Sequence, residues 1–153
     1  MRSVRLQIAT AVSSVALALA MQAANHGFEA AGSVPDIESC GFLAGSLGAL
    51  AMVYPTLAAL VAGRAVRALG RVLMPGIQEA ASIGSVVGLA GACLYFGFGV
   101  LLMALRGADA VLTPSLGILL GLDCLLCAAA GALGAAAAAA RLQPGWRDAS
   151  GQP

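Results

Sequence analysis

Residues 115–140 are SLGILLGLDCLLCAAAGALGAAAAAA, an apolar stretch that carries one charged side chain, Asp123. A helix needs about 20 mainly apolar residues to cross a hydrocarbon core about 30 Å thick. Apolar and polar residues do not alternate here, and the stretch is longer than a β-strand. We therefore expect a transmembrane helix, because a single helix satisfies its backbone hydrogen bonds within itself, whereas a strand in lipid needs a closed barrel.

Three further stretches have the same character. They are residues 6–24, residues 41–63, which include Pro55, and residues 80–105, which contain no charged side chain. Pro75-Gly76 and Pro114 interrupt the chain between these stretches, as expected of short connections. The sequence therefore predicts an all-α integral membrane four-helix bundle in which residues 1–153 form a single membrane domain.

The composition supports this prediction and excludes several other classes. Hydrophobic residues make up 60% of the chain, charged residues 10%, and the mean hydropathy is +0.93. A soluble domain has about a quarter of its residues charged, and a disordered chain is poorer in apolar residues. The formal net charge of +1 is too small to attract a nucleic acid. The expected partner is the lipid bilayer.

The distribution of arginine predicts the orientation in the membrane. Arg2 and Arg5 precede the first stretch, Arg64, Arg67 and Arg71 follow the second, and Arg141 and Arg147 follow the fourth. The other two connections contain one arginine between them, Arg106. Because cytoplasmic connections are enriched in basic residues, we expect both termini to face the cytoplasm, in a cell membrane or a bacterial inner membrane.

A secretory signal peptide is an alternative interpretation of the first stretch. Arg2 and Arg5 precede an apolar run from Ile8 to Ala20. Ala18 and Ala20 form a small-residue pattern of the kind that signal peptidase cleaves. Cleavage would leave three helices and an external N-terminus. The arginine distribution favours an uncleaved first helix.

Glycines recur on one face of two of the expected helices. Gly84, Gly88 and Gly91 lie on one face of residues 80–105, and Gly131 and Gly134 share a face of residues 115–140 with Asp123. Small residues let membrane helices approach closely, which matters because lipid supplies little hydrophobic drive for helix association. These glycines predict tight helix packing, although small residues are frequent by chance in a sequence so rich in Gly and Ala.

Asp123 is the most informative side chain in the sequence. A carboxyl group near the bilayer centre costs several kcal/mol unless it is protonated, paired or exposed to water. At about 1.5 Å per residue, Asp123 and Tyr95 lie about 20 Å and about 18 Å from the cytoplasmic boundary. We therefore predict a hydrogen bond from the Tyr95 hydroxyl to Asp123. The functional alternative is that Asp123 forms a proton or cation site.

Cys124 and Cys127 form a C-x-x-C pair in the same stretch, the spacing at which one thiol attacks and the other resolves a mixed disulfide. Four helices with Cys124-Leu125-Leu126-Cys127 in the fourth resemble the vitamin K epoxide reductase family. The resemblance implies a membrane thiol oxidoreductase with a second cysteine pair after the first helix, where this chain has Cys40 alone. Apolar burial, which makes a thiol inert, favours a packing role for both cysteines.

Arg64, Arg67 and Arg71 share a helical face if the second helix continues beyond the membrane. They are interpreted as topology determinants, or as a site for anionic lipid head groups. No catalytic arrangement, metal site or cofactor motif is recognised. The sequence therefore favours a non-enzymatic interaction, assembly or accessory subunit, either a homo-oligomer or part of a larger membrane complex. A small proton- or cation-coupled transporter using Asp123 and a thiol oxidoreductase are the alternatives.

Overall fold

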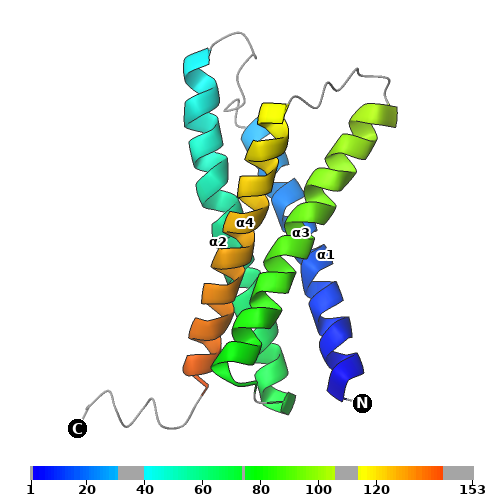
Figure 1. Cartoon of the computed structure of the whole chain (residues 1–153), viewed down its shortest axis with the longest axis vertical. Coiled ribbons are helices and arrows are strands. Elements are labelled where there is room, and N and C mark those ends of the chain that lie inside the picture. Colours follow the sequence, from blue (N-terminus) through cyan, green and yellow to red (C-terminus); the bar gives the residue numbers. More distant parts are fainter. Residues whose placement is uncertain (1, 31–39, 74, 106–113, 143–153) are drawn as a thin grey trace, which may run out of the picture.

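A computed structural model of the chain describes residues 2–30, 40–73, 75–105 and 114–142. Within these ranges the chain forms four helices: α1 (Arg2–Ala30), α2 (Cys40–Leu73), α3 (Ile77–Leu105) and α4 (Pro114–Ala140). The helices run alternately up and down, so that the start of α1 and the end of α4 lie at the same end of the bundle (Figure 1). The predicted all-α four-helix bundle is confirmed.

Each helix contains a segment long and apolar enough to cross a membrane. Among the described residues these segments are Val4–Gly27, Met52–Gly70, Ile77–Leu101 and Gly117–Ala140. The chain is therefore a multi-pass membrane protein with four candidate spans.

The helices extend beyond the apolar stretches that predict them. The largest difference is in α2, which continues from residue 63 to Leu73 and carries Arg64 and Arg67 on its extension. The apolar boundary marks where the hydrocarbon ends, whereas a helix ends where the backbone is interrupted. Here Pro75 and Gly76 supply that interruption, and the Gly76 carbonyl then accepts the Ala80 N–H at 2.8 Å as α3 begins.

The four helices do not contribute equally to the packing. α4 packs extensively against both α3 and α2, and α1 packs mainly against α3. Leu17 and Met21 of α1 are nevertheless completely buried, and Ser14 is nearly so. The middle of α1 is therefore part of the bundle core.

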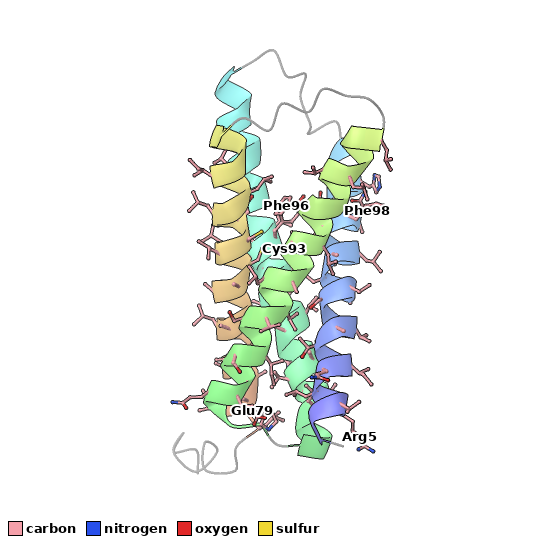
Figure 2. All side chains as sticks on the ribbon, turned by 45° about the vertical axis from the view of Figure 1, so that its right-hand side comes forward. Arg5, Glu79, Cys93, Phe96 and Phe98 are labelled. Carbon is pink, nitrogen blue, oxygen red and sulfur yellow. The ribbon has the colours of Figure 1, made fainter. Side chains whose placement is uncertain are left out.

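Small side chains fill the interior and large ones cover the outside. The commonest buried apolar residue is alanine, with Ala58, Ala62, Ala80, Ala92, Ala128, Ala135, Ala138 and Ala139 in the core. By contrast, Leu60, Leu105 and Leu133 are all more than half exposed, and side chains project outward along the helices in Figure 2. This distribution is suited to lipid, which solvates leucine well and leaves helix association to close backbone packing.

The glycines that the sequence assigns to helix packing all face a neighbouring helix. A Cβ at Gly84 would collide with the Gly131 carbonyl of α4, and a Cβ at Gly88 with the Cys127 carbonyl. Gly91 lies instead against Leu17 of α1. The glycine face of α3 is therefore divided between two partners, because α3 lies between α1 and α4.

α3 and α4 diverge toward the end of the bundle where α3 finishes and α4 begins, as both overall views show (Figures 1 and 2). Four glycines lie in this half: Gly97 and Gly99 of α3, and Gly117 and Gly121 of α4. A Cβ at any of them would meet no heavy atom within 4 Å among the described residues. Among the described residues, the close α3–α4 backbone contacts thus lie in one half of the bundle, and we call the other half, where the two helices diverge, the open half.

Gly88→Ala should destabilise the bundle, because the new methyl group meets backbone that cannot rotate away. Overpacking of this kind costs about 1–3 kcal/mol. Gly97→Ala is the matched control, since it makes the same change in the same helix with free space around it. It should leave the protein at least as stable as the parent, because alanine favours the helix over glycine. Denaturation by sodium dodecyl sulfate, followed by circular dichroism, measures both, and equal stability of the two variants would contradict the assigned contact.

Candidate functional site

A polar and aromatic cluster lies in the middle of the bundle. Tyr54 of α2 and Cys127 of α4 are buried in one core cluster with Leu17 and Met21 of α1, and Tyr95 and Cys124 pack against it. The cluster therefore joins all four helices. It contains Tyr95, Cys124 and Cys127, which the sequence analysis names as candidate functional residues.

The hydroxyl of Tyr95 has a different partner from the one expected. It lies 3.0 Å from the Tyr54 hydroxyl of α2, and either group is able to donate. The predicted hydrogen bond from Tyr95 to Asp123 is therefore wrong. The two tyrosine rings meet edge to face with centroids 5.3 Å apart, and Phe96 completes an aromatic trio at 6.2 Å from Tyr54 and 5.2 Å from Tyr95. Such edge-to-face pairs are favourable beyond the area that they bury.

Asp123 lies at the edge of this cluster. It is half-buried, and the next residue of α4, Cys124, packs against the cluster. No hydrogen bond joins it to another described residue. The Asp123 side chain is therefore only partly buried, and it has no hydrogen-bond partner among the residues described.

The cysteine pair brought together in space is not the pair that is close in sequence. The Sγ atoms of Cys93, on α3, and Cys124, on α4, are 3.9 Å apart. Cys93 is exposed on the bundle surface, Cys124 is half-buried and Cys127 is buried. Cys127 instead packs its backbone against Gly88. The surroundings of the Cys40 side chain lie outside the described part of the structure.

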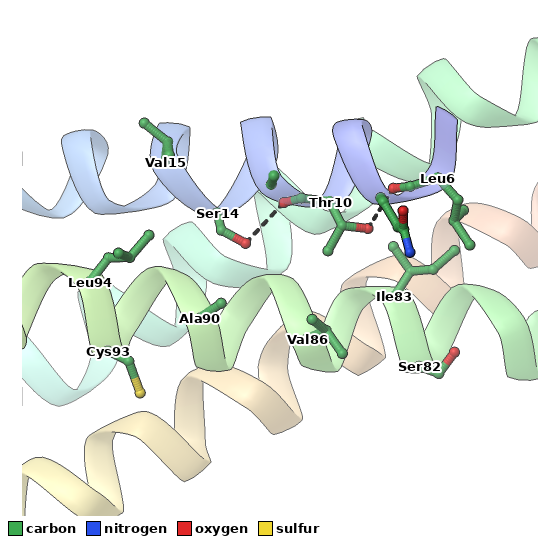
Figure 3. Close-up of a pocket in the computed structure, with 12 residues that line it drawn as sticks. Leu6, Thr10, Ser14, Val15, Ser82, Ile83, Val86, Ala90, Cys93 and Leu94 are labelled. Carbon is green, nitrogen blue, oxygen red and sulfur yellow. Dashed lines mark hydrogen bonds between the residues drawn. The ribbon is translucent and has the colours of Figure 1, made fainter. Parts of the chain in front are cut away.

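A groove of about 830 Å³ runs along the surface between α1 and α3. Its lining is mostly aliphatic, with Ile83, Val86 and Leu94 on one side and Val15 on the other (Figure 3). Its hydroxyl groups on α1 are internally satisfied, because Thr10 donates to the Leu6 carbonyl and Ser14 to the Thr10 carbonyl, each at 2.9 Å. Such a groove suits hydrocarbon chains rather than a polar ligand.

A second groove of about 310 Å³ continues between the same helices and is lined by residues including Leu19, Gln22, Tyr95 and Phe98. Asp123 lines neither groove. They therefore give no support to a transport pathway through Asp123.

The arginines gather at one end of the bundle. Arg64 and Arg67 are exposed on the last part of α2, and the same end holds Arg5 and Glu79 (Figure 2). Arg141 follows α4 at this end and is also exposed. The surroundings of the Arg71 side chain lie outside the described residues. Three helices thus place positive charge on one side of the candidate spans.

One face of α4 carries small residues at alternating spacings of four and three. We call it the α4 seam, and it consists of Gly117, Gly121, Cys124, Ala128, Gly131, Ala135 and Ala138. From Ala128 onward every member is buried, with contacts to Gly84 and Gly88 of α3 and to Gly63 of α2. Gly117 and Gly121 are exposed. The same packing surface therefore continues into the open half, where no described helix covers it.

The fold and its polar cluster define a class, the small multi-pass membrane protein. Beyond that class, comparisons with protein-family models, with curated proteins and with solved structures find no match to this chain.

The sequence did not identify two members of the cluster, Tyr54 as the partner of Tyr95 and Cys93 as the partner of Cys124. The register between α3 and α4, which only the structure gives, explains the second pair. Gly84 meets Gly131 and Gly88 meets Cys127, so each four-residue step along α3 matches a four-residue step back along α4. One further step brings residue 92 level with residue 123, and the two cysteines follow them.

The tyrosine pair predicts a measurable coupling. Tyr54→Phe should destabilise the bundle by about 1 kcal/mol, because it leaves the Tyr95 hydroxyl without its partner. Tyr95→Phe should do the same, and the double variant should cost less than the sum of the two. The expected coupling energy is about 0.6 kcal/mol, and at most about 1.7 kcal/mol. Strictly additive effects in a double-mutant cycle would show that the two hydroxyls do not interact.

Proposed function

We propose that this chain is a non-catalytic assembly or accessory subunit, which associates through its membrane helices with further copies of itself or with a larger membrane complex. The observation that carries the proposal is the uncovered part of the α4 seam, Gly117 and Gly121, which are exposed and contact no described helix.

Helix packing in lipid provides the physical argument. Two exposed glycines four residues apart allow the backbone of another helix to come close, and dispersion contacts then accumulate along the seam. In the packed half the same seam accommodates α3 and α2 at glycine-to-backbone distance. A helix docked on the open half would use the same kind of contact.

Asp123 adds a polar reason for association. An ionisable side chain within a span is costly where it lacks a partner, and such residues usually face protein. Asp123 is two residues from Gly121, which places it about 200° around α4 on a different face from the seam. It has no side-chain hydrogen-bond partner among the described residues. A partner helix that reaches this second face of α4 and donates a hydrogen bond to Asp123 would lower this cost and would select a partner that carries a donor.

Gly121→Leu should weaken association, because the leucine side chain would hold a docking helix away from the seam. We expect at least a tenfold loss of affinity, which corresponds to about 1.4 kcal/mol. Gly97→Leu is the matched control. Gly97 is also an exposed glycine of the open half, and a Cβ placed there would meet no heavy atom within 4 Å among the described residues. It belongs to α3, however, and so lies outside the α4 seam.

Sedimentation equilibrium in density-matched micelles measures self-association of the two variants and the parent. If the parent is monomeric, co-purification from native membranes in mild detergent tests for a different partner. The proposal fails if Gly121→Leu associates as the parent does, or if neither experiment finds a complex.

Asp123→Asn separates assembly from transport. Asparagine still accepts a hydrogen bond, so we expect the Asp123→Asn variant to retain most of its association, whereas a proton or cation site would lose its titratable group. Reconstituted vesicles measure ion flux alongside the oligomeric state. Loss of an ion flux with intact association would favour the transport function over the one proposed here.

We also propose that the arginine-rich end faces the cytoplasm. Arg64, Arg67 and Arg141 lie at that end, and the basic-residue bias of cytoplasmic connections supports the assignment. In a variant without its native cysteines, Arg141→Cys should react with a membrane-impermeant maleimide only after cells are permeabilised. Labelling in intact cells would reverse the orientation.

A further inference from the structure

The thiols of Cys93 and Cys124 form a pair that the proposed assembly function does not use. Their Sγ atoms are 3.9 Å apart and belong to different helices. A disulfide has an S–S length of about 2.0 Å and joins Cβ atoms about 3.5–4.5 Å apart. The two Sγ atoms, now 3.9 Å apart, would have to approach by about 1.9 Å for the bond to form.

The backbones at this level are held close by the glycine contacts next to it. Gly88 lies against the backbone of Cys127, and Gly84 lies against that of Gly131. Cys93 and Cys124 are five and three residues beyond the Gly88–Cys127 contact, on the side toward the open half. They are therefore at the point where α3 and α4 begin to separate.

Cys93 has a second feature that matters for chemistry. It is exposed and borders the groove between α1 and α3, while its side chain points from α3 to the side where α4 lies (Figure 3). A molecule dissolved in the hydrocarbon would reach this thiol without entering the bundle. Charged, water-soluble oxidants are excluded from this depth.

We propose that Cys93 and Cys124 are the site of a reversible disulfide between α3 and α4, formed by an organic hydroperoxide dissolved in the surrounding lipid. The Cys93 sulfur attacks the terminal oxygen of the hydroperoxide, so that an S–O bond forms and the O–O bond breaks. The thiol proton passes to the departing alkoxide, which leaves as an alcohol, and Cys93 becomes a sulfenic acid. The Cys124 thiol then displaces the sulfenic hydroxyl as water and forms the S–S bond. Two thiols are oxidised by two electrons in total, and one hydroperoxide is reduced to alcohol and water.

Cys127 is not the resolving thiol in this scheme. It shares a helix with Cys124, is buried, and packs against Gly88. A disulfide within α4 would join no second helix, whereas the Cys93–Cys124 bond fixes the separation of α3 and α4 at the entrance to the open half. The modified site would thus set the width of the opening beside Gly121.

Trypsin provides a direct assay, because the chain has no lysine and Arg106 separates the two cysteines. Cleavage after Arg71, Arg106 and Arg141 yields one fragment with Cys93 and another with both Cys124 and Cys127. A Cys93–Cys124 disulfide links the two fragments, while a Cys124–Cys127 disulfide stays inside one. Mass spectrometry without reductant distinguishes them.

The experiment treats the full chain in lipid nanodiscs with cumene hydroperoxide or with hydrogen peroxide, and then blocks the remaining thiols. We expect linked fragments with the organic hydroperoxide, their loss in Cys93→Ser, their persistence in Cys127→Ser, and their reversal by dithiothreitol. In Cys124→Ser, dimedone should trap the sulfenic acid on Cys93. Monomeric nanodiscs exclude a bond between two copies.

Three results would overturn the proposal. They are a disulfide confined to the Cys124–Cys127 fragment, linked fragments that persist in Cys93→Ser, and thiols that all survive the organic hydroperoxide. If hydrogen peroxide links the two fragments and cumene hydroperoxide does not, the oxidant is a peroxide from the water phase. The proposal of a lipid-dissolved oxidant would then be wrong. None of these outcomes depends on whether the chain associates with a partner.

Discussion

The close approach of the α3 and α4 backbones is the contact on which the rest of the bundle depends. Gly84 against Gly131 and Gly88 against Cys127 leave no room for a side chain. In water, burial of leucine and valine would hold such helices together, but in lipid the tails solvate those side chains equally well. Contact at backbone distance, with its dispersion energy, is what remains to distinguish the folded bundle from separate helices.

This constraint explains which residues are inside. A core of alanine and glycine lets α4 pack against α2 and α3 together, and the larger side chains are displaced to the surface. It also explains the position of α1, whose Leu17 fills the space above Gly91. Glycine on one helix and a larger side chain on the other give complementary shapes there, whereas the α3–α4 contact pairs glycine with backbone.

The sequence predicts the helix number, the candidate spans and the glycine contacts because each follows from one segment at a time. Length and hydropathy define a span, and spacing defines a face. The partners in the central cluster depend on how far each helix is rotated and shifted against its neighbours, and no single segment contains that information. Tyr95 illustrates the difference, since its depth agrees with that of Asp123 but its hydroxyl is directed to Tyr54 on α2.

The polar side chains in the middle of the bundle differ in whether they have a hydrogen-bond partner within it. This difference distinguishes groups with a structural role from a candidate functional group. Tyr54 and Tyr95 satisfy each other, and Ser14 and Thr10 satisfy themselves on their own helix. These groups have no remaining need for a partner. Asp123 has no such bond among the described residues, and it lies at the depth of the uncovered part of the α4 seam but on a different face of α4. Protonation lowers the cost of a carboxyl group in lipid, and a hydrogen-bond donor on a partner helix would lower it further.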